Sequence, residues 1–180
     1  MLSKNFSIND DYKVLLFVKQ GFYAETYRVK GNDGKLYFLK LFNFSQLHKS
    51  AFDEDNNILE IELVKTIQHP NLVTYKDSGE IVIENKKYAY LVLDFIAGET
   101  LSEKIVREKY KSLYDIKSII IEILEGLKYL HQQANPIIHN EITLQNVMLD
   151  LAQGNPKTKI IDFGYAREFH QSSKVFNKEG

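Results

Sequence analysis

Three oxygen-bearing side chains stand in two short segments toward the C-terminal end of the sequence. Glu141 and Asn146 lie in a polar stretch that follows the aliphatic residues 137–138, and Asp162 follows the aliphatic residues 160–161. Aliphatic flanks of this kind anchor a loop in the core while its polar centre reaches a cleft. Carboxylate and amide oxygens suit a hard cation of the magnesium type, which keeps several waters beside a phosphate. The two segments therefore predict a site for a divalent cation and an attacking hydroxyl group.

Two kinds of secondary structure are expected to position this site. Alternating or continuous apolar patterns predict strands at residues 12–18, 25–29, 36–42, 79–84 and 88–95. Residues 53–68 change to a helical period, and a second hairpin is expected to turn around Asn85 and Lys86. After Gly98 the pattern becomes helical, with capping-box spacing at Thr100 and Ser112. The broad apolar stripe of residues 116–130 predicts a central buried helix.

Composition excludes several classes of protein. The chain has 180 residues, a formal net charge of −1 and no cysteine. One domain with a sizeable core is the default at this length. The charge argues against a nucleic acid or a membrane surface as an electrostatic partner, and the absence of thiols excludes disulfides and thiolate metal sites. No apolar run approaches the thickness of a bilayer, so a cytoplasmic protein is expected.

The two polar segments resemble the catalytic loop and the metal-binding Asp-Phe-Gly motif of eukaryotic-type protein kinases. By this resemblance Glu141 takes the place of the catalytic acid, and Asn146 and Asp162 are the Mg²⁺ ligands. Lys40 looks like the strand lysine that contacts the α- and β-phosphates of ATP. Glu60 looks like the helix glutamate that pairs with this lysine. An ammonium on a flexible stem is held in place by the opposite charge before the phosphates arrive.

The resemblance also covers the segments that bind the nucleotide in the family. Gly21 matches the middle glycine of the glycine-rich loop. Residues 91–96 resemble the hinge that hydrogen-bonds adenine through backbone groups, with Leu93 in the gatekeeper place and Asp94 and Ile96 beside it. The resemblance implies ATP and Mg²⁺ as cofactors and a protein as substrate or regulatory partner.

The fold that the resemblance implies is α+β and bilobal. Residues 1–96 would form the N-terminal lobe, with a five-stranded antiparallel sheet and one main helix. Residues 97–180 would form a partial helical lobe that ends within the activation segment, soon after Ser172 and Ser173. We therefore expect a fragment of a longer kinase domain. Its stripe-bearing helix would then show an apolar flank to water, which predicts pairing with a second copy through the incomplete lobe.

Several residues depart from the family pattern in ways that bear on activity. Lys19 and Ala24 replace two glycines, and side chains there would hinder the approach of backbone amides to phosphates. Phe38 shares a strand face with Lys40 and replaces a small residue, so it is expected to crowd the adenine. Glu141 is longer than the family's aspartate by one methylene, and a misplacement of about 1 Å can cost roughly a hundredfold in rate.

Two further departures lie in the catalytic loop. Asn140 replaces an arginine, and Thr143 replaces a lysine whose charge would lie near the transferred phosphoryl group. Three functions follow from these matches and departures: a Ser/Thr protein kinase whose turnover in this chain is weak, a pseudokinase that acts as a nucleotide-binding or regulatory module, and a small-molecule phosphotransferase of the choline- or aminoglycoside-kinase type. The His-Pro-Asn at residues 69–71 and the intact Asp-Phe-Gly at residues 162–164 favour the protein-kinase branch over the third.

Overall fold

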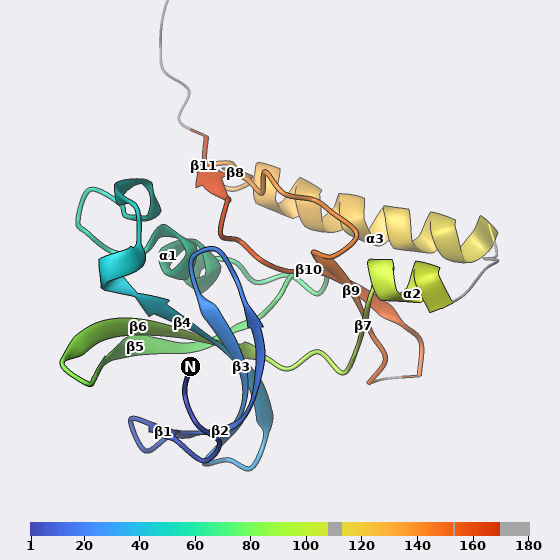
Figure 1. The fold of residues 1–180 in the computed structure, drawn as a ribbon. Helices are drawn as coiled ribbons and strands as arrows, with labels where there is room; N and C mark the ends of the chain where they lie inside the picture. Colours follow the sequence, from blue (N-terminus) through green and yellow to red (C-terminus); the bar gives the residue numbers. More distant parts are fainter. Residues whose placement is uncertain (108–112, 153, 170–180) are drawn as a thin grey trace, which may run out of the picture.

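A computed structural model describes residues 1–107, 113–152 and 154–169 of the chain (Figure 1). Ser112, Ser172 and Ser173, to which a helix cap and the activation segment were assigned, lie outside these residues. The elements in chain order are β1 (Ser7–Ile8), β2 (Tyr12–Gln20), β3 (Glu25–Gly31), β4 (Leu36–Asn43), the 3₁₀ turns η1 (Phe44–Gln46) and η2 (Lys49–Ala51), α1 (Leu59–Thr66), β5 (Tyr75–Ile83), β6 (Lys86–Asp94), β7 (Gly98–Thr100), α2 (Leu101–Arg107), α3 (Leu113–His131), β8 (Ile137–Ile138), β9 (Val147–Asp150), β10 (Lys157–Ile160) and β11 (Arg167–Glu168).

The N-terminal lobe is built on one antiparallel sheet with strand order β1-β2-β3-β4-β6-β5. Its five long strands are those expected from the sequence. The two-residue strand β1 adds a sixth at the edge, where Ile8 pairs with Tyr12. The β5–β6 turn lies one residue earlier than expected, because Glu84 and Asn85 have φ angles of 49° and 61°. Positive φ at both central residues is what a two-residue hairpin turn requires.

The helix expected over residues 53–68 is confined to α1. The Oδ1 atom of Asp53 accepts hydrogen bonds from the backbone N–H groups of Asp55 and Asn57, at 3.0 and 2.8 Å. Such side-chain contacts offer the backbone an alternative to helical hydrogen bonds. The prediction was therefore wrong over residues 53–58 and 67–68, and it was correct for the helical segment that carries Glu60.

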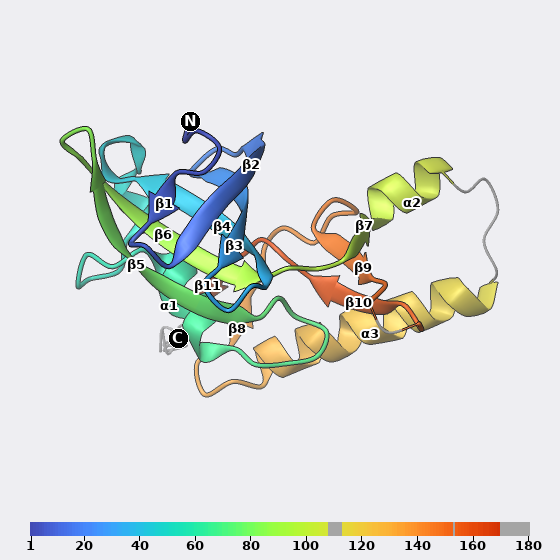
Figure 2. The ribbon, with the colours of Figure 1, turned by 90° about the horizontal axis from the view of Figure 1, so that it is seen from below.

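The two lobes lie side by side and are joined through the segment between β6 and β7 (Figures 1 and 2). Gly98 begins β7 where a Cβ atom would lie 1.7 Å from the carbonyl oxygen of Leu149, so only glycine fits against β9. A second connection is a backbone pairing of residues 71–73 with β10: Val73 donates its N–H to Ile160, at 2.9 Å. The polar segments predicted to do chemistry follow β8 and β10, and each is therefore held by a short ladder of the second lobe.

The capping box expected at Thr100 is confirmed. Its hydroxyl accepts the backbone N–H of Glu103 at 3.1 Å, and the Glu103 carboxylate accepts the backbone N–H of Thr100 at 2.7 Å. These reciprocal contacts satisfy two donors at the start of α2. Among the described residues, no helix combines the length and the apolar character that crossing a membrane needs.

Helix α3 packs on the rest of its lobe by one side only. A Cβ atom at Gly126 would lie 3.2 Å from the side chains of Ile160 and Leu72, which shows how closely the helix approaches β10. On the other flank, Ile120 and Leu124 are 50% and 57% exposed. The expectation of a central buried helix is therefore wrong for the described chain, whereas the expected exposed apolar flank is confirmed. An amphipathic stripe this broad exceeds what one packing surface covers.

Candidate active site

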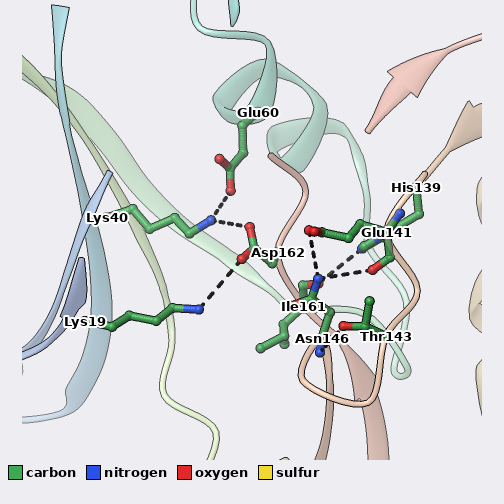
Figure 3. Close-up of polar contacts among 9 residues, drawn as sticks. All are labelled: Lys19, Lys40, Glu60, His139, Glu141, Thr143, Asn146, Ile161 and Asp162. Carbon is green, nitrogen blue, oxygen red and sulfur yellow. Dashed lines mark hydrogen bonds and ion pairs between the residues drawn. The ribbon is translucent and has the colours of Figure 1, made fainter. Parts of the chain in front are cut away.

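Lys40, in the middle of β4, connects the two lobes where they face each other (Figure 3). Its Nζ atom lies 2.5 Å from Oε1 of Glu60 on α1 and 2.6 Å from Oδ1 of Asp162, which follows β10. The side chains of Lys40, Glu60 and Asp162 are 13%, 7% and 24% exposed, so most of their charge is removed from water. The structure thus brings together the predicted lysine–glutamate pair and the predicted metal-binding aspartate.

Electrostatics keep Lys40 and Asp162 ionised. Burial by itself would lower the pKa of Lys40, but the carboxylates of Glu60 and Asp162 outweigh that effect and raise it. Burial raises the pKa of Glu60, and the charge of Lys40 opposes the rise. Burial would also raise the pKa of Asp162, but Lys40 and its hydrogen bond lower it overall. Lys40 is therefore a cation, and Asp162 an anion, at neutral pH.

His139 joins the segment of Glu141 to the segment of Asp162. Its ring is 1% exposed and packs edge-on against Phe163, with centroids 4.8 Å apart. Its Nδ1 atom accepts the backbone N–H of Glu141 at 3.3 Å, and Nε2 lies 3.1 Å from the carbonyl oxygen of Ile161. These contacts suit a neutral ring with its proton on Nε2. Burial lowers the pKa of His139, which agrees with that protonation state.

Asn146 orients Glu141. Its Nδ2 atom donates to the backbone carbonyl and to Oε2 of Glu141, at 3.1 and 3.0 Å, and Thr143 holds its backbone N–H (Figure 3). Both amide hydrogens are thereby used on Glu141, and Oδ1 is the atom available to a cation. One carboxylate from Asp162 and this one amide oxygen form a donor set that fits Mg²⁺, which keeps waters and takes its other ligands from phosphates.

The predicted catalytic residues share one cavity of about 70 Å³ beneath the turn between β2 and β3. The rings of Tyr23 and Tyr165, with centroids 6.0 Å apart, are neighbours in its wall. The sequence contains no signal for this ring pair, because it arises when the turn folds onto the segment after β10. The residues that line the cavity are Lys19, Gly21, Phe22, Tyr23, Ala24, Thr26, Lys40, Glu60, Glu141, Asp162, Gly164 and Tyr165.

The predicted adenine contacts are not gathered in the same cavity. Gly21 and Lys40 belong to the described residues that line it, and Leu93, Asp94 and Ile96 do not. Leu93 and Ile96 are 7% and 3% exposed, and they pack in the core between the sheet and the second lobe. A role of these hinge residues in binding adenine stays a prediction.

Phe38 stands at the hinge, as its strand position predicts. The register of β4 and β6 pairs it directly with Leu93, on the face that also carries Lys40. Its ring lies 5.1 Å from the ring of Phe95, and the guanidinium group of Arg28 lies 4.9 Å from the Phe95 ring centroid. Three large side chains thus lie next to the place where the base of a nucleotide is expected.

Sequence reasoning missed the contact of Lys19. Its Nζ atom lies 3.9 Å from Oδ2 of Asp162, on the other side of the carboxylate from Lys40. In the folded sheet Lys19 pairs with Thr26, and Thr26 pairs with Lys40. Directly opposed residues of neighbouring antiparallel strands point to the same face. This pairing depends on an irregularity of the β2–β3 register between Phe17 and Lys19, so strand alternation alone would not have placed Lys19 above Asp162.

Comparison with known proteins agrees with this geometry. A family model described as "Protein kinase domain" matches residues 12–180. The chain is 27% identical over 180 residues to Calcium-dependent protein kinase 4 of Plasmodium berghei. The aligned region covers 99% of the chain and 33% of that protein. The chain is 31% identical over 168 residues to Ribosomal protein S6 kinase 2 alpha of Gallus gallus, which covers 92% of the chain and 20% of that protein. The chain spans a third or less of the length of these relatives.

Proposed function

This chain belongs to the protein kinase family, and on that premise we propose that its cleft binds MgATP for γ-phosphoryl transfer to a Ser or Thr hydroxyl of a protein. The observation that carries the proposal is the position of Lys40, within 2.6 Å of carboxylates from both lobes. A lysine fixed between a helix glutamate and a metal-binding aspartate is suited to hold phosphates beside a cation.

The predicted catalytic and metal-binding residues then have defined roles. Lys40 donates to phosphate oxygens while Glu60 keeps its amine in place. Asp162 and Asn146 would supply oxygens to Mg²⁺, which would neutralise charge on the transferred phosphoryl group. Glu141 accepts the proton of the acceptor hydroxyl, and its carboxylate is held for this by Nδ2 of Asn146 at 3.0 Å.

Thermal unfolding with and without MgATP tests nucleotide binding. We expect MgATP to raise the melting temperature of the wild type but not of Asp162→Asn, which removes the charged ligand of the cation. Lys13→Met changes an exposed lysine of the same lobe and should respond to MgATP as the wild type does. Equal melting temperatures with and without MgATP in the wild type would eliminate every ATP-dependent function.

Phosphorylation of a generic protein substrate tests transfer. We expect Glu141→Asp to increase incorporation of labelled phosphate, because the shorter acid restores the family's reach to the hydroxyl. Glu141→Gln retains the size of the side chain without its basicity and should abolish incorporation. Silence of wild type and Glu141→Asp alike would support a pseudokinase.

The second candidate function is a pseudokinase, and the position of Phe38 favours it. Its ring, packed 5.1 Å from Phe95, narrows the place of the base. In that case the lobes bind a nucleotide weakly and act through contacts with a regulatory partner. The exposed flank of α3 is a surface for such contacts. We propose that a second copy of the chain covers it, because Ile120 and Leu124 of the two copies would bury their aliphatic side chains against one another.

A further inference from the structure

The turn between β2 and β3 contains an internal backbone hydrogen bond. Gly21 donates its N–H to the carbonyl oxygen of Ala24 at 2.8 Å, and a Cβ atom at Gly21 would lie 3.1 Å from that oxygen. Phe22 extends from the tip of the turn and is 85% exposed. Backbone amides that cradle phosphates must point into the site without an internal acceptor. The N–H of Gly21 is thus bonded within the turn and does not point to a phosphate.

Lys19 brings a positive charge to the same place from the end of β2. Figure 3 shows its amine and the amine of Lys40 directed at the two oxygens of Asp162 from the same lobe. The shared ladder partner Thr26 fixes both lysines on the cleft face of the sheet. The 3.9 Å separation of Lys19 from Asp162 is longer than a hydrogen bond, and the side chain is 57% exposed, so its amine is free to move to a ligand.

The charge balance of the cavity calls for this second cation. Among the described residues that line it, Lys19 and Lys40 are the cations, and they face the carboxylates of Glu60, Glu141 and Asp162. Position 143 carries a threonine, so the catalytic segment adds no positive charge there. Entry of a polyphosphate adds several negative charges to a lining that already holds three carboxyl side chains.

We infer that Lys19 is a second phosphate-binding lysine, which moves from Asp162 to a phosphate oxygen when a nucleotide and its cation enter. The side chain of Lys19 would then provide a positive charge to the phosphates. Thr143 carries no charge, and the N–H of Gly21 is already bonded within the turn. This inference rests on the proposed binding of MgATP and goes beyond it, because it assigns part of the phosphate affinity to a position where a side chain was expected only to obstruct.

Calorimetric titration of the chain with MgATP, MgADP and adenosine tests the inference. We expect Lys19→Met to weaken MgATP binding by about fivefold, as for the loss of one partly exposed charge-assisted contact, and to leave adenosine binding unchanged. Lys19→Arg keeps the charge and should bind MgATP as the wild type does. Affinity of the wild type should also decrease more steeply with added salt than that of Lys19→Met. Lys13→Met, on the same strand and exposed, is the matched control.

The outcomes separate this inference from the function on which it rests. If the wild type binds MgATP and Lys40→Met weakens binding while Lys19→Met does not, Lys19 is only a partner of Asp162 and the inference is overturned alone. Tighter MgATP binding by Lys19→Met also overturns it, because the lysine would then compete with the cation. If the wild type binds neither MgATP nor MgADP, the inference and the proposed function are both overturned.

Discussion

Replacing Lys40 by methionine should destabilise the protein strongly, independently of any activity. The change leaves the carboxylates of Glu60 and Asp162 facing each other without the amine that now lies 2.5 and 2.6 Å from them. The side chain of Glu60 is only 7% exposed, so water cannot solvate its carboxylate once the amine is removed. Breaking a buried ion pair on one side costs about 3–5 kcal/mol. The lower value applies here, because Asp162 is 24% exposed and retains Lys19.

Chemical denaturation followed by circular dichroism measures this cost. A loss of about 3 kcal/mol corresponds to a decrease of roughly 6–12 °C in melting temperature for a domain of this size. Adding Glu60→Leu to Lys40→Met should recover at least half of the loss, because it removes the unpaired buried carboxylate. Lys30→Met changes an exposed lysine of the same sheet and should stay within about 0.5 kcal/mol of the wild type.

The pH dependence of the loss has a definite sign. Burial raises the folded-state pKa of Glu60 above its ordinary value, and without Lys40 the rise becomes larger. A carboxyl group whose pKa is raised in the folded state lowers the free energy of unfolding of the protein as the pH increases above the unfolded pKa of about 4.3. The difference between wild type and Lys40→Met should therefore grow from pH 5 to pH 8. A variant within about 1 kcal/mol of the wild type at pH 8, or a double variant no more stable than the single one, would refute the reasoning.

Three further outcomes are expected. Phe38→Ala should tighten MgATP binding in calorimetric titration if its ring occupies the place of the base, and unchanged affinity would show that the base binds elsewhere. Glu122→Ala should lower the free energy of unfolding by about 1–3 kcal/mol, because its carboxylate accepts the backbone N–H of Thr158 at 2.7 Å and no acceptor would remain; Glu122→Gln, which keeps an acceptor, should cost less. Leu124→Lys should shift the mass measured by light scattering from dimer to monomer, and a wild type that is monomeric at high concentration would contradict pairing through α3.

The sequence by itself determined the elements and motifs whose signals are local. Alternating apolar residues mark the five long strands, and strand-type flanks mark the segments of Glu141 and Asp162, because these patterns follow from the period of a strand and from burial on its faces. Motif order also predicts the pairing of Lys40 with Glu60. The resemblance to kinases supplied the pairing of lobes that local patterns do not contain.

Only the tertiary structure decided how those elements meet. The start of α1 depends on contacts of Asp53, which compete with the helical period. The contact of Lys19 with Asp162 depends on strand register and on the approach of two segments that lie more than a hundred residues apart in sequence. The exposed flank of α3 depends on which surfaces are present to cover it. The side-chain pattern determines which groups are stabilised by burial or by an opposite charge, whereas long-range packing determines which residues they contact.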